Sequence, residues 1–135
     1  MADSPAQRPA SIQKAQVMPL LLAACPSFQV SWAAHRAGWG DDEPLLYIDL
    51  AAFARHLVNL MRQEQVSELP AVFAVVERLH TEGDSYVQEA ATIGLLEDLQ
   101  NLALNEQLDP ASFLRYLKPE TTRWWTKLND FWSRR

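Results

Sequence analysis

The sequence predicts one all-α domain of about five or six helices packed as antiparallel hairpins. Three observations support this class. Apolar residues recur at three- and four-residue spacing through most of the chain, and prolines, glycines and capping residues separate these stripes. No alternation of strand and helix patterns, typical of a parallel sheet, is present. The 135 residues are 48% hydrophobic and 21% charged, which is enough for one core. We expect residues 1–10 to form a disordered tail and residues 11–135 to form the helical domain.

The first half of the chain is expected to hold two helices separated by an irregular region. Ser11 is a candidate N-cap for a helix that Pro26 ends. The segment 26–48 contains glycines and prolines, so we expect loops there with short extended pieces. Asp49 is a candidate N-cap for the next helix, which has a clear apolar stripe.

Capping residues and prolines divide the second half into four helices. Ser67 and Asp84 each precede an apolar stripe, and Gly83 lies between the two stripes. Asp109, followed by a proline, is expected to cap a short helix. Pro119 is expected to begin the last helix, which is rich in tryptophan.

The helix after Asp84 carries polar residues within an otherwise apolar pattern. On a helical wheel with about 100° per residue, Glu89 and Gln100 form the solvent edge. Three other polar residues share the face of the small alanines and glycine, namely Glu97, Asp98 and Asn101. Buried carboxylates need hydrogen-bond donors, and the candidates are backbone N–H groups, tryptophan indoles, Arg78 and His80. We expect these three residues to be structural, with a ligand or partner site as the alternative.

Glu77 and His80 have the Glu-x-x-His spacing found in di-metal helical bundles. A full site needs a second copy of the motif, and neither other histidine has an acid three residues before it. We therefore expect Glu77 to be structural, and we expect no metal, no cofactor and no catalytic residues. A small metal-binding protein or enzyme built on Glu77, His80, Glu97 and Asp98 remains an alternative.

Charge and composition narrow the classes of partner. The formal net charge of −5 disfavours nucleic acid. The apolar runs are too short for a membrane span, and the start of the chain does not read as a secretory leader. The single cysteine, Cys25, fits a reducing compartment, so a cytoplasmic location is expected. Acids gather in two places that a basic partner could contact: Asp41, Asp42 and Glu43 in a loop, and Glu82, Asp84 and Glu89 farther on.

Four short motifs carry a resemblance to a known group of proteins. They are F-x-x-x-E-R-L from Phe73, E-G-D-x-x-V-Q from Glu82, G-x-L-E-D-L-Q-N from Gly94 and W-x-x-L-x-x-F-W from Trp125. The chain from about Leu45 onward resembles a family of small, uncharacterised bacterial helical domains, similar to immunity proteins of bacterial toxin systems. The resemblance implies a protein that binds and neutralises a cognate toxin domain by direct contact. A general helical adaptor or regulatory protein is the alternative.

Overall fold

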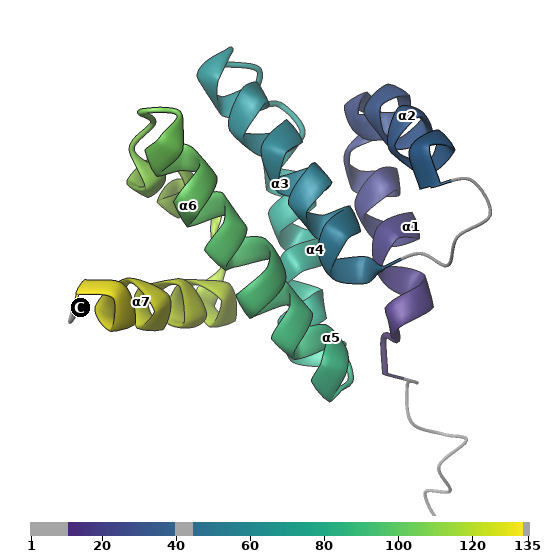
Figure 1. The fold of residues 1–135 in the computed structure, drawn as a ribbon. Helices are drawn as coiled ribbons and strands as arrows, with labels where there is room; N and C mark the ends of the chain where they lie inside the picture. Colours follow the sequence, from purple (N-terminus) through teal and green to yellow (C-terminus); the bar gives the residue numbers. More distant parts are fainter. Residues whose placement is uncertain (1–10, 40–44, 134–135) are drawn as a thin grey trace, which may run out of the picture.

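The computed structural model describes residues 11–39 and 45–133, which form seven α-helices with short η segments and no β-strand (Figure 1). The all-α class is confirmed, whereas the expected number of five or six helices was too low. The expected tail at 1–10 and the loop acids at 41–43 lie outside the described residues. In chain order the elements are α1 (Lys14–Ala24), η2 (Pro26–Phe28), α2 (Gln29–Trp39), α3 (Leu46–Arg62), α4 (Leu69–Glu82), α5 (Ser85–Glu89), η3 (Ala90–Leu96), α6 (Glu97–Asn105), η4 (Pro110–Tyr116) and α7 (Pro119–Ser133).

The region expected to be irregular is largely helical. It contributes η2, α2 and the first turn of α3. Asp49 is not an N-cap, because α3 begins at Leu46 and Asp49 lies in its first turn with only 3% of its surface exposed. Leu46 is already buried, so the apolar face of α3 starts one turn earlier than the capping pattern indicated. Glu68, and not Ser67, is the residue that precedes α4.

The other three helix starts expected in the second half, at Asp84, Asp109 and Pro119, are observed. The Asp84 carboxylate accepts a hydrogen bond of 2.9 Å from the Val87 amide and caps α5. Asp109 accepts a bond of 2.9 Å from the Ala111 amide, although the element that it begins is the 3₁₀-helix η4. Pro119 is the first residue of α7.

The segments α5, η3 and α6 follow one another without a break, and we call them together the long helix. Its middle segment, η3, is π-helical. A π turn contains about one more residue than an α turn, so the residues after it are rotated by about 100° from their places on a uniform α-helical wheel. Gln100, expected at the solvent edge, is therefore 4% exposed. Asn101, expected on the buried face, is exposed.

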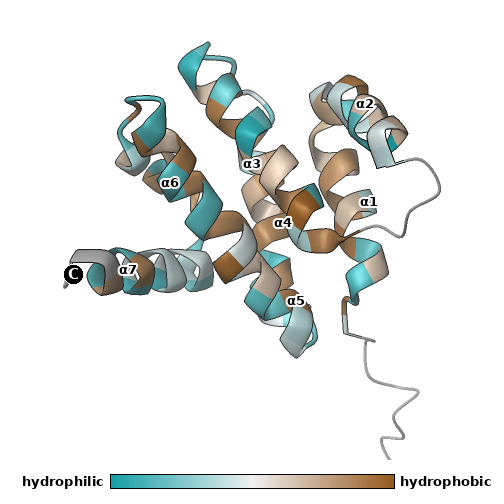
Figure 2. Cartoon of the chain, in the orientation of Figure 1, coloured by the Kyte–Doolittle hydropathy of each residue, from teal (hydrophilic) through white to brown (hydrophobic). Residues whose placement is uncertain are grey.

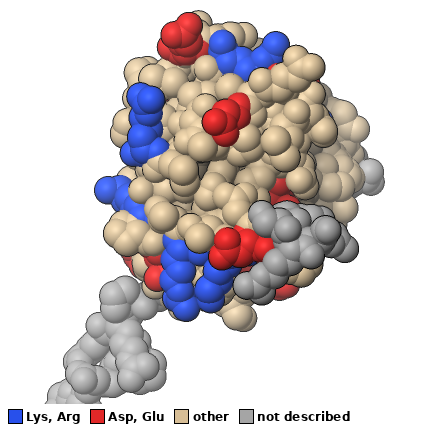
Figure 3. Space-filling view, turned by 90° about the vertical axis from the view of Figure 1, so that its left-hand side faces the viewer, with Lys and Arg blue, Asp and Glu red and all other residues tan. Residues whose placement is uncertain are grey.

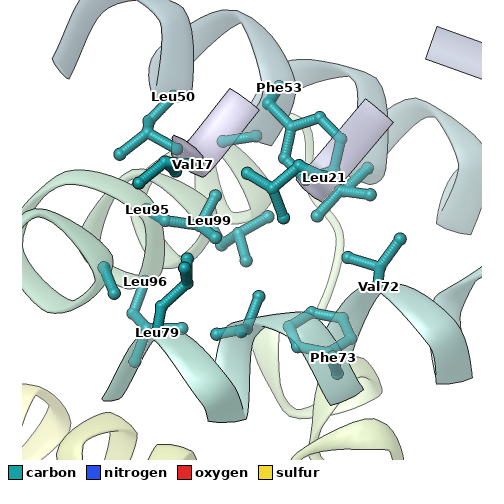
Figure 4. Close-up of a cluster of buried hydrophobic side chains, with 14 of the residues drawn as sticks. Val17, Leu21, Leu50, Phe53, Val72, Phe73, Leu79, Leu95, Leu96 and Leu99 are labelled. Atoms are coloured by element: carbon teal, nitrogen blue, oxygen red, sulfur yellow. The ribbon is translucent and has the colours of Figure 1, made fainter. Parts of the chain in front are cut away.

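One hydrophobic core joins the helices (Figure 4). Helix α1 packs on α4, α3 packs on η3 and α6, and α7 packs on α4 and η3. Figure 2 shows the hydrophobic colouring concentrated where these helices meet, with hydrophilic residues at the outer ends of α3 and α6. Residues labelled in the core close-up come from four helices and from η3, among them Leu21, Phe53, Phe73, Leu95 and Leu99.

The start of the described chain is fastened to the junction between α4 and α5. The Ile12 amide donates to the Glu82 carbonyl, and the Asp84 amide donates to the Ile12 carbonyl, both at 2.9 Å. The junction residue is Gly83, with an ordinary φ of −73°. A Cβ there would overlap the Leu79 carbonyl oxygen and lie 2.6 Å from Val87 Cγ1. Close packing, and not a left-handed turn, therefore requires glycine at this position.

Within the described residues, no single helix is long and apolar enough to cross a membrane. The pair formed by Lys14–Ala24 and Pro26–Trp39 has sufficient length and apolar character together, but it is bent by 105°.

Candidate functional site

Glu77 on α4 binds the N-terminal turn of α7. Its carboxylate accepts from the Glu120 amide at 3.0 Å, and from the Thr121 amide and hydroxyl at 2.9 Å each. The first amides of a helix have no partners within that helix, so this carboxylate acts as a cap supplied by another element. Burial works to raise the pKa of Glu77, but these hydrogen bonds outweigh it and the pKa lies below its ordinary value.

His80 lies one turn after Glu77 and is 6% exposed. Its Nδ1 is 3.1 Å from the Val76 carbonyl oxygen and 3.0 Å from Thr121 Oγ1, and its Nε2 is 3.0 Å from Thr92 Oγ1. The Thr121 hydroxyl gives its only proton to Glu77, so toward His80 its oxygen accepts and Nδ1 is the protonated nitrogen. Nε2 therefore accepts from the Thr92 hydroxyl. Burial lowers the pKa of His80, which agrees with a neutral ring. The Glu-x-x-His pair thus holds α4, η3 and α7 together.

The three polar residues of the second half of the long helix do not form such a network. Glu97 and Asp98 are half-buried and Asn101 is exposed, and no side-chain hydrogen bond to them is found within residues 11–39 and 45–133. Burial, followed by the charge of Glu97, raises the pKa of Asp98, while the charge of Arg55 opposes the change. Two of the expected donors have other partners: Arg78 pairs with Glu82, and His80 contacts Val76, Thr92 and Thr121.

The acids expected to contact a partner differ in their surroundings. Glu82 and Glu89 are exposed, whereas Asp84 is half-buried and serves as the cap of α5. The exposed Glu82 carboxylate pairs with Arg78 at 3.2 Å. Glu89 has no ion pair among the described residues, which makes it the least compensated of Glu82, Asp84 and Glu89.

An aromatic pair lies beside Glu89. The rings of Tyr47 on α3 and Tyr86 on α5 meet edge to face, with 6.0 Å between centroids. Burial, followed by the charge of Glu89, raises the pKa of Tyr47. Tyr86 is 39% exposed, and the Lys14 ammonium lies 5.8 Å from its ring centroid. Ile93 on the same helix is 44% exposed. We call Tyr47, Tyr86, Glu89 and Ile93 the tyrosine surface.

A polar cluster that sequence reasoning missed joins η2, α3 and α4. The Ser27 hydroxyl donates to Glu68 Oε1 at 2.5 Å and lies 2.8 Å from His56 Nε2. The Ser27 amide and the Cys25 thiol, each at 3.2 Å, also donate to Glu68. The hydroxyl has one proton, so His56 must donate to it. The His56 imidazole and the Glu68 carboxylate thus both bind the Ser27 hydroxyl. This differs from a catalytic triad, in which the carboxylate binds and orients the histidine.

The titration behaviour of this cluster agrees with a structural role. Burial acts to raise the pKa of Glu68, but the bonds from Ser27 and Cys25 and the charge of His56 give a net lowering. Burial lowers the pKa of His56 and, assisted by Glu68, raises that of Cys25 to about 11. At neutral pH the thiol is therefore protonated and a poor nucleophile. In the sequence, Pro26 was the only local indication of the short η2 turn that carries Ser27.

The face that carries the outer end of α7 is sparsely charged. Figure 3 shows it as largely uncharged, with lysine and arginine side chains scattered along its edge and few acids. On α7 the Lys127 ammonium and the Arg123 guanidinium lie 4.6 Å and 5.3 Å from the Trp124 ring centroid. The tyrosine surface, with its single acid Glu89, and the cations around Trp124 on α7 are thus built from different elements.

Within the ranges that the structure describes, no three histidine, cysteine or acidic side chains are grouped so that they could hold a metal ion. The polar clusters connect helix ends, and the fold is an all-α domain with one hydrophobic core and hydrogen bonds between its elements. The chain belongs to the family described as a domain of unknown function (DUF7674), whose model matches residues 18–133. Comparison with curated proteins and with solved structures gives no match.

Proposed function

We propose that the protein is an immunity protein that binds a cognate bacterial toxin domain, and that the tyrosine surface is its contact. The observation that carries the proposal is Glu89, an exposed acid that has no ion pair among the described residues and lies beside the partly exposed Tyr86. Tyrosine is one of the residue types enriched among the side chains that contribute most binding energy at protein interfaces, while charges at the rim set the association rate and discriminate between partners. An acid at this position is complementary to a basic toxin domain.

The first test asks whether the protein protects cells from a toxin. The C-terminal domain of a large secreted protein encoded next to this chain's gene, if present, is expressed with and without the chain. Growth that is restored by the chain, together with a stable complex of the purified pair, supports the proposal. Binding to several unrelated proteins without protection would favour the adaptor alternative.

The second test asks where the toxin domain binds. Glu89→Lys should slow association with it, most strongly at low salt, because exposed charges act through a field that salt screens. The matched control is Glu64→Lys, which makes the same change in net charge at an exposed acid beyond the opposite end of α3. Association rates of both variants are measured against ionic strength. Equal rates for the two variants would rule out docking at the tyrosine surface.

A further inference from the structure

A cavity of about 640 Å³ lies between the first two turns of α1, the helix α2, the first turn of α3 and the cap of α5. Its apolar wall consists of Met18, Pro19, Trp32 and Leu46. The volume is in the range of small-molecule pockets, about 300–1,000 Å³. The roles described above for the hydrogen-bond clusters and the tyrosine surface do not involve this cavity.

Two cations line the cavity without an anionic partner within the described residues, Lys14 and Arg36. The Arg36 guanidinium carbon lies 5.8 Å from the Trp32 ring centroid, and its Nη1 is buried with no hydrogen bond. A buried donor without an acceptor is destabilising, so an acceptor from a ligand would satisfy a need that the fold leaves open.

Two carboxylates line the same cavity, Asp49 and Asp84. Asp49 is 3% exposed, and its Oδ1 lies 2.7 Å from His35 Nε2. No hydrogen bond to Asp49 Oδ2 is found in the described part of the chain. Asp84 uses Oδ1 to cap α5. The cavity therefore presents acceptors as well as donors beside an apolar wall.

We propose that this cavity binds a small zwitterion with an apolar body, namely a free apolar amino acid or a short peptide with both ends unblocked. The ligand carboxylate pairs with Arg36 and Lys14, and its ammonium pairs with Asp49 and Asp84. A purely anionic ligand would face the like charges of Asp49 and Asp84, and a purely cationic ligand would face those of Arg36 and Lys14. An apolar side chain fills the space against Met18, Trp32 and Leu46. This proposal does not depend on the toxin-binding role.

Calorimetry of the full chain with leucine, leucyl-leucine and trileucine tests the proposal. Saturable binding of at least one probe is expected, and the best binder is then compared with its N-acetyl and C-terminal amide derivatives. Each derivative should bind about tenfold more weakly or worse, because it loses one charged hydrogen-bonding end. No saturable binding of any free probe, or equal binding of free and blocked forms, would overturn the proposal.

Arg36→Gln identifies the end of the ligand that this side chain binds. The variant should weaken binding of the free probe about tenfold and leave binding of its C-terminal amide unchanged. Arg78→Gln, at an exposed arginine on α4 that does not line the cavity, is the matched control and should change neither value. If Arg36→Gln melts early, Lys14→Gln at an exposed position provides the same comparison. An equal loss for both ligand forms in these variants would contradict the assigned orientation.

Discussion

Glu77 shows how one side chain can join distant parts of this chain. Its two oxygens receive three hydrogen bonds from residues 43 and 44 positions later, and these bonds fix where α7 begins. Hydrogen bonds to an ionised carboxylate are stronger than those between neutral groups. The half-buried Glu97, which the sequence pattern predicted to be structural like Glu77, receives no side-chain hydrogen bond within the described residues.

Glu77→Ala should lower the free energy of unfolding by about 1–3 kcal/mol, because it leaves the Glu120 and Thr121 amides without acceptors. Glu82→Ala is the control, since this exposed acid pairs only with the exposed Arg78 and should cost about 0–1 kcal/mol. Urea unfolding of both variants provides the comparison. Equal stability of the two variants would show that the cap is unimportant.

His80 should make stability depend on pH. Burial lowers its pKa in the folded state below the ordinary value of 6.5, so the unfolded chain binds more protons as the pH falls past that value. Stability contributed by the neutral ring is therefore present above about pH 6.5 and is lost as the pH falls toward the folded pKa. Glu77 and Glu68, whose pKa values are lowered, add a further loss only below their ordinary value of 4.5.

Urea midpoints between pH 8 and pH 5 measure this dependence. The variant His80→Gln should show a flatter profile than the parent. His56, whose pKa burial also lowers, accounts for part of the remaining slope and can be removed in the same way. An unchanged slope in His80→Gln would mean that the ring titrates alike in the folded and unfolded states.

At the scale of elements, backbone approach and helical phase decide the packing. Gly94 in η3 lies under Tyr47, where a Cβ would be 3.1 Å from the Tyr47 Cδ1 atom. The π-helical segment that contains Gly94 turns Gln100 inward. The side-chain amide of Gln100 then donates to the Trp125 backbone carbonyl at 3.2 Å. The π-helical segment thus packs on α3, and Gln100 after it contacts α7.

Gly83→Ala should destabilise the protein by about 1–3 kcal/mol, because the added methyl group overlaps backbone and side chain at the junction of α4 and α5. The same change at Gly38, where a Cβ would have nothing within 4 Å, should be neutral or stabilising by up to about 1 kcal/mol. Thermal unfolding of the two variants gives opposite or clearly unequal shifts if the packing is as described. A Gly83→Ala protein as stable as the parent would refute the close contact.

At the scale of the whole molecule, an aromatic series connects α7 to the core. Trp125 is 1% exposed, its ring centroid is 6.3 Å from that of Phe113, and Phe113 is 6.2 Å from Phe73 on α4. Its neighbour Trp124 is only half-buried beneath a lysine and an arginine of α7. The two adjacent tryptophans therefore have different roles, one in the core and one near the surface.

Trp125→Ala should cost about 3–5 kcal/mol and should release α7 from the core. Trp124→Ala loses a partly buried ring and its cation contacts, and we expect a smaller cost of about 1 kcal/mol. Chemical denaturation measures both values, and amide hydrogen exchange along α7 shows whether the helix detaches. A larger cost at Trp124 would reverse the assignment of the two rings.

The sequence alone determined the helical class and several helix starts. Asp84, Asp109 and Pro119 begin their elements as expected, because capping and the proline ring act on the nearest few residues. Tertiary contacts overrode local propensity at Asp49, which fits a cap but is buried against His35 within α3.

Only the tertiary structure decided which polar side chains meet. The partners of Glu77, and the contacts that bring Ser27, His56 and Glu68 together, span 29 to 44 positions, and no local pattern records such distances. The phase of the long helix was also beyond the sequence, because a wheel adds the same angle at every residue and one π-helical turn displaces all the residues that follow it. The cavity has the same origin, since its charged walls belong to three separate helices and to the cap of a fourth.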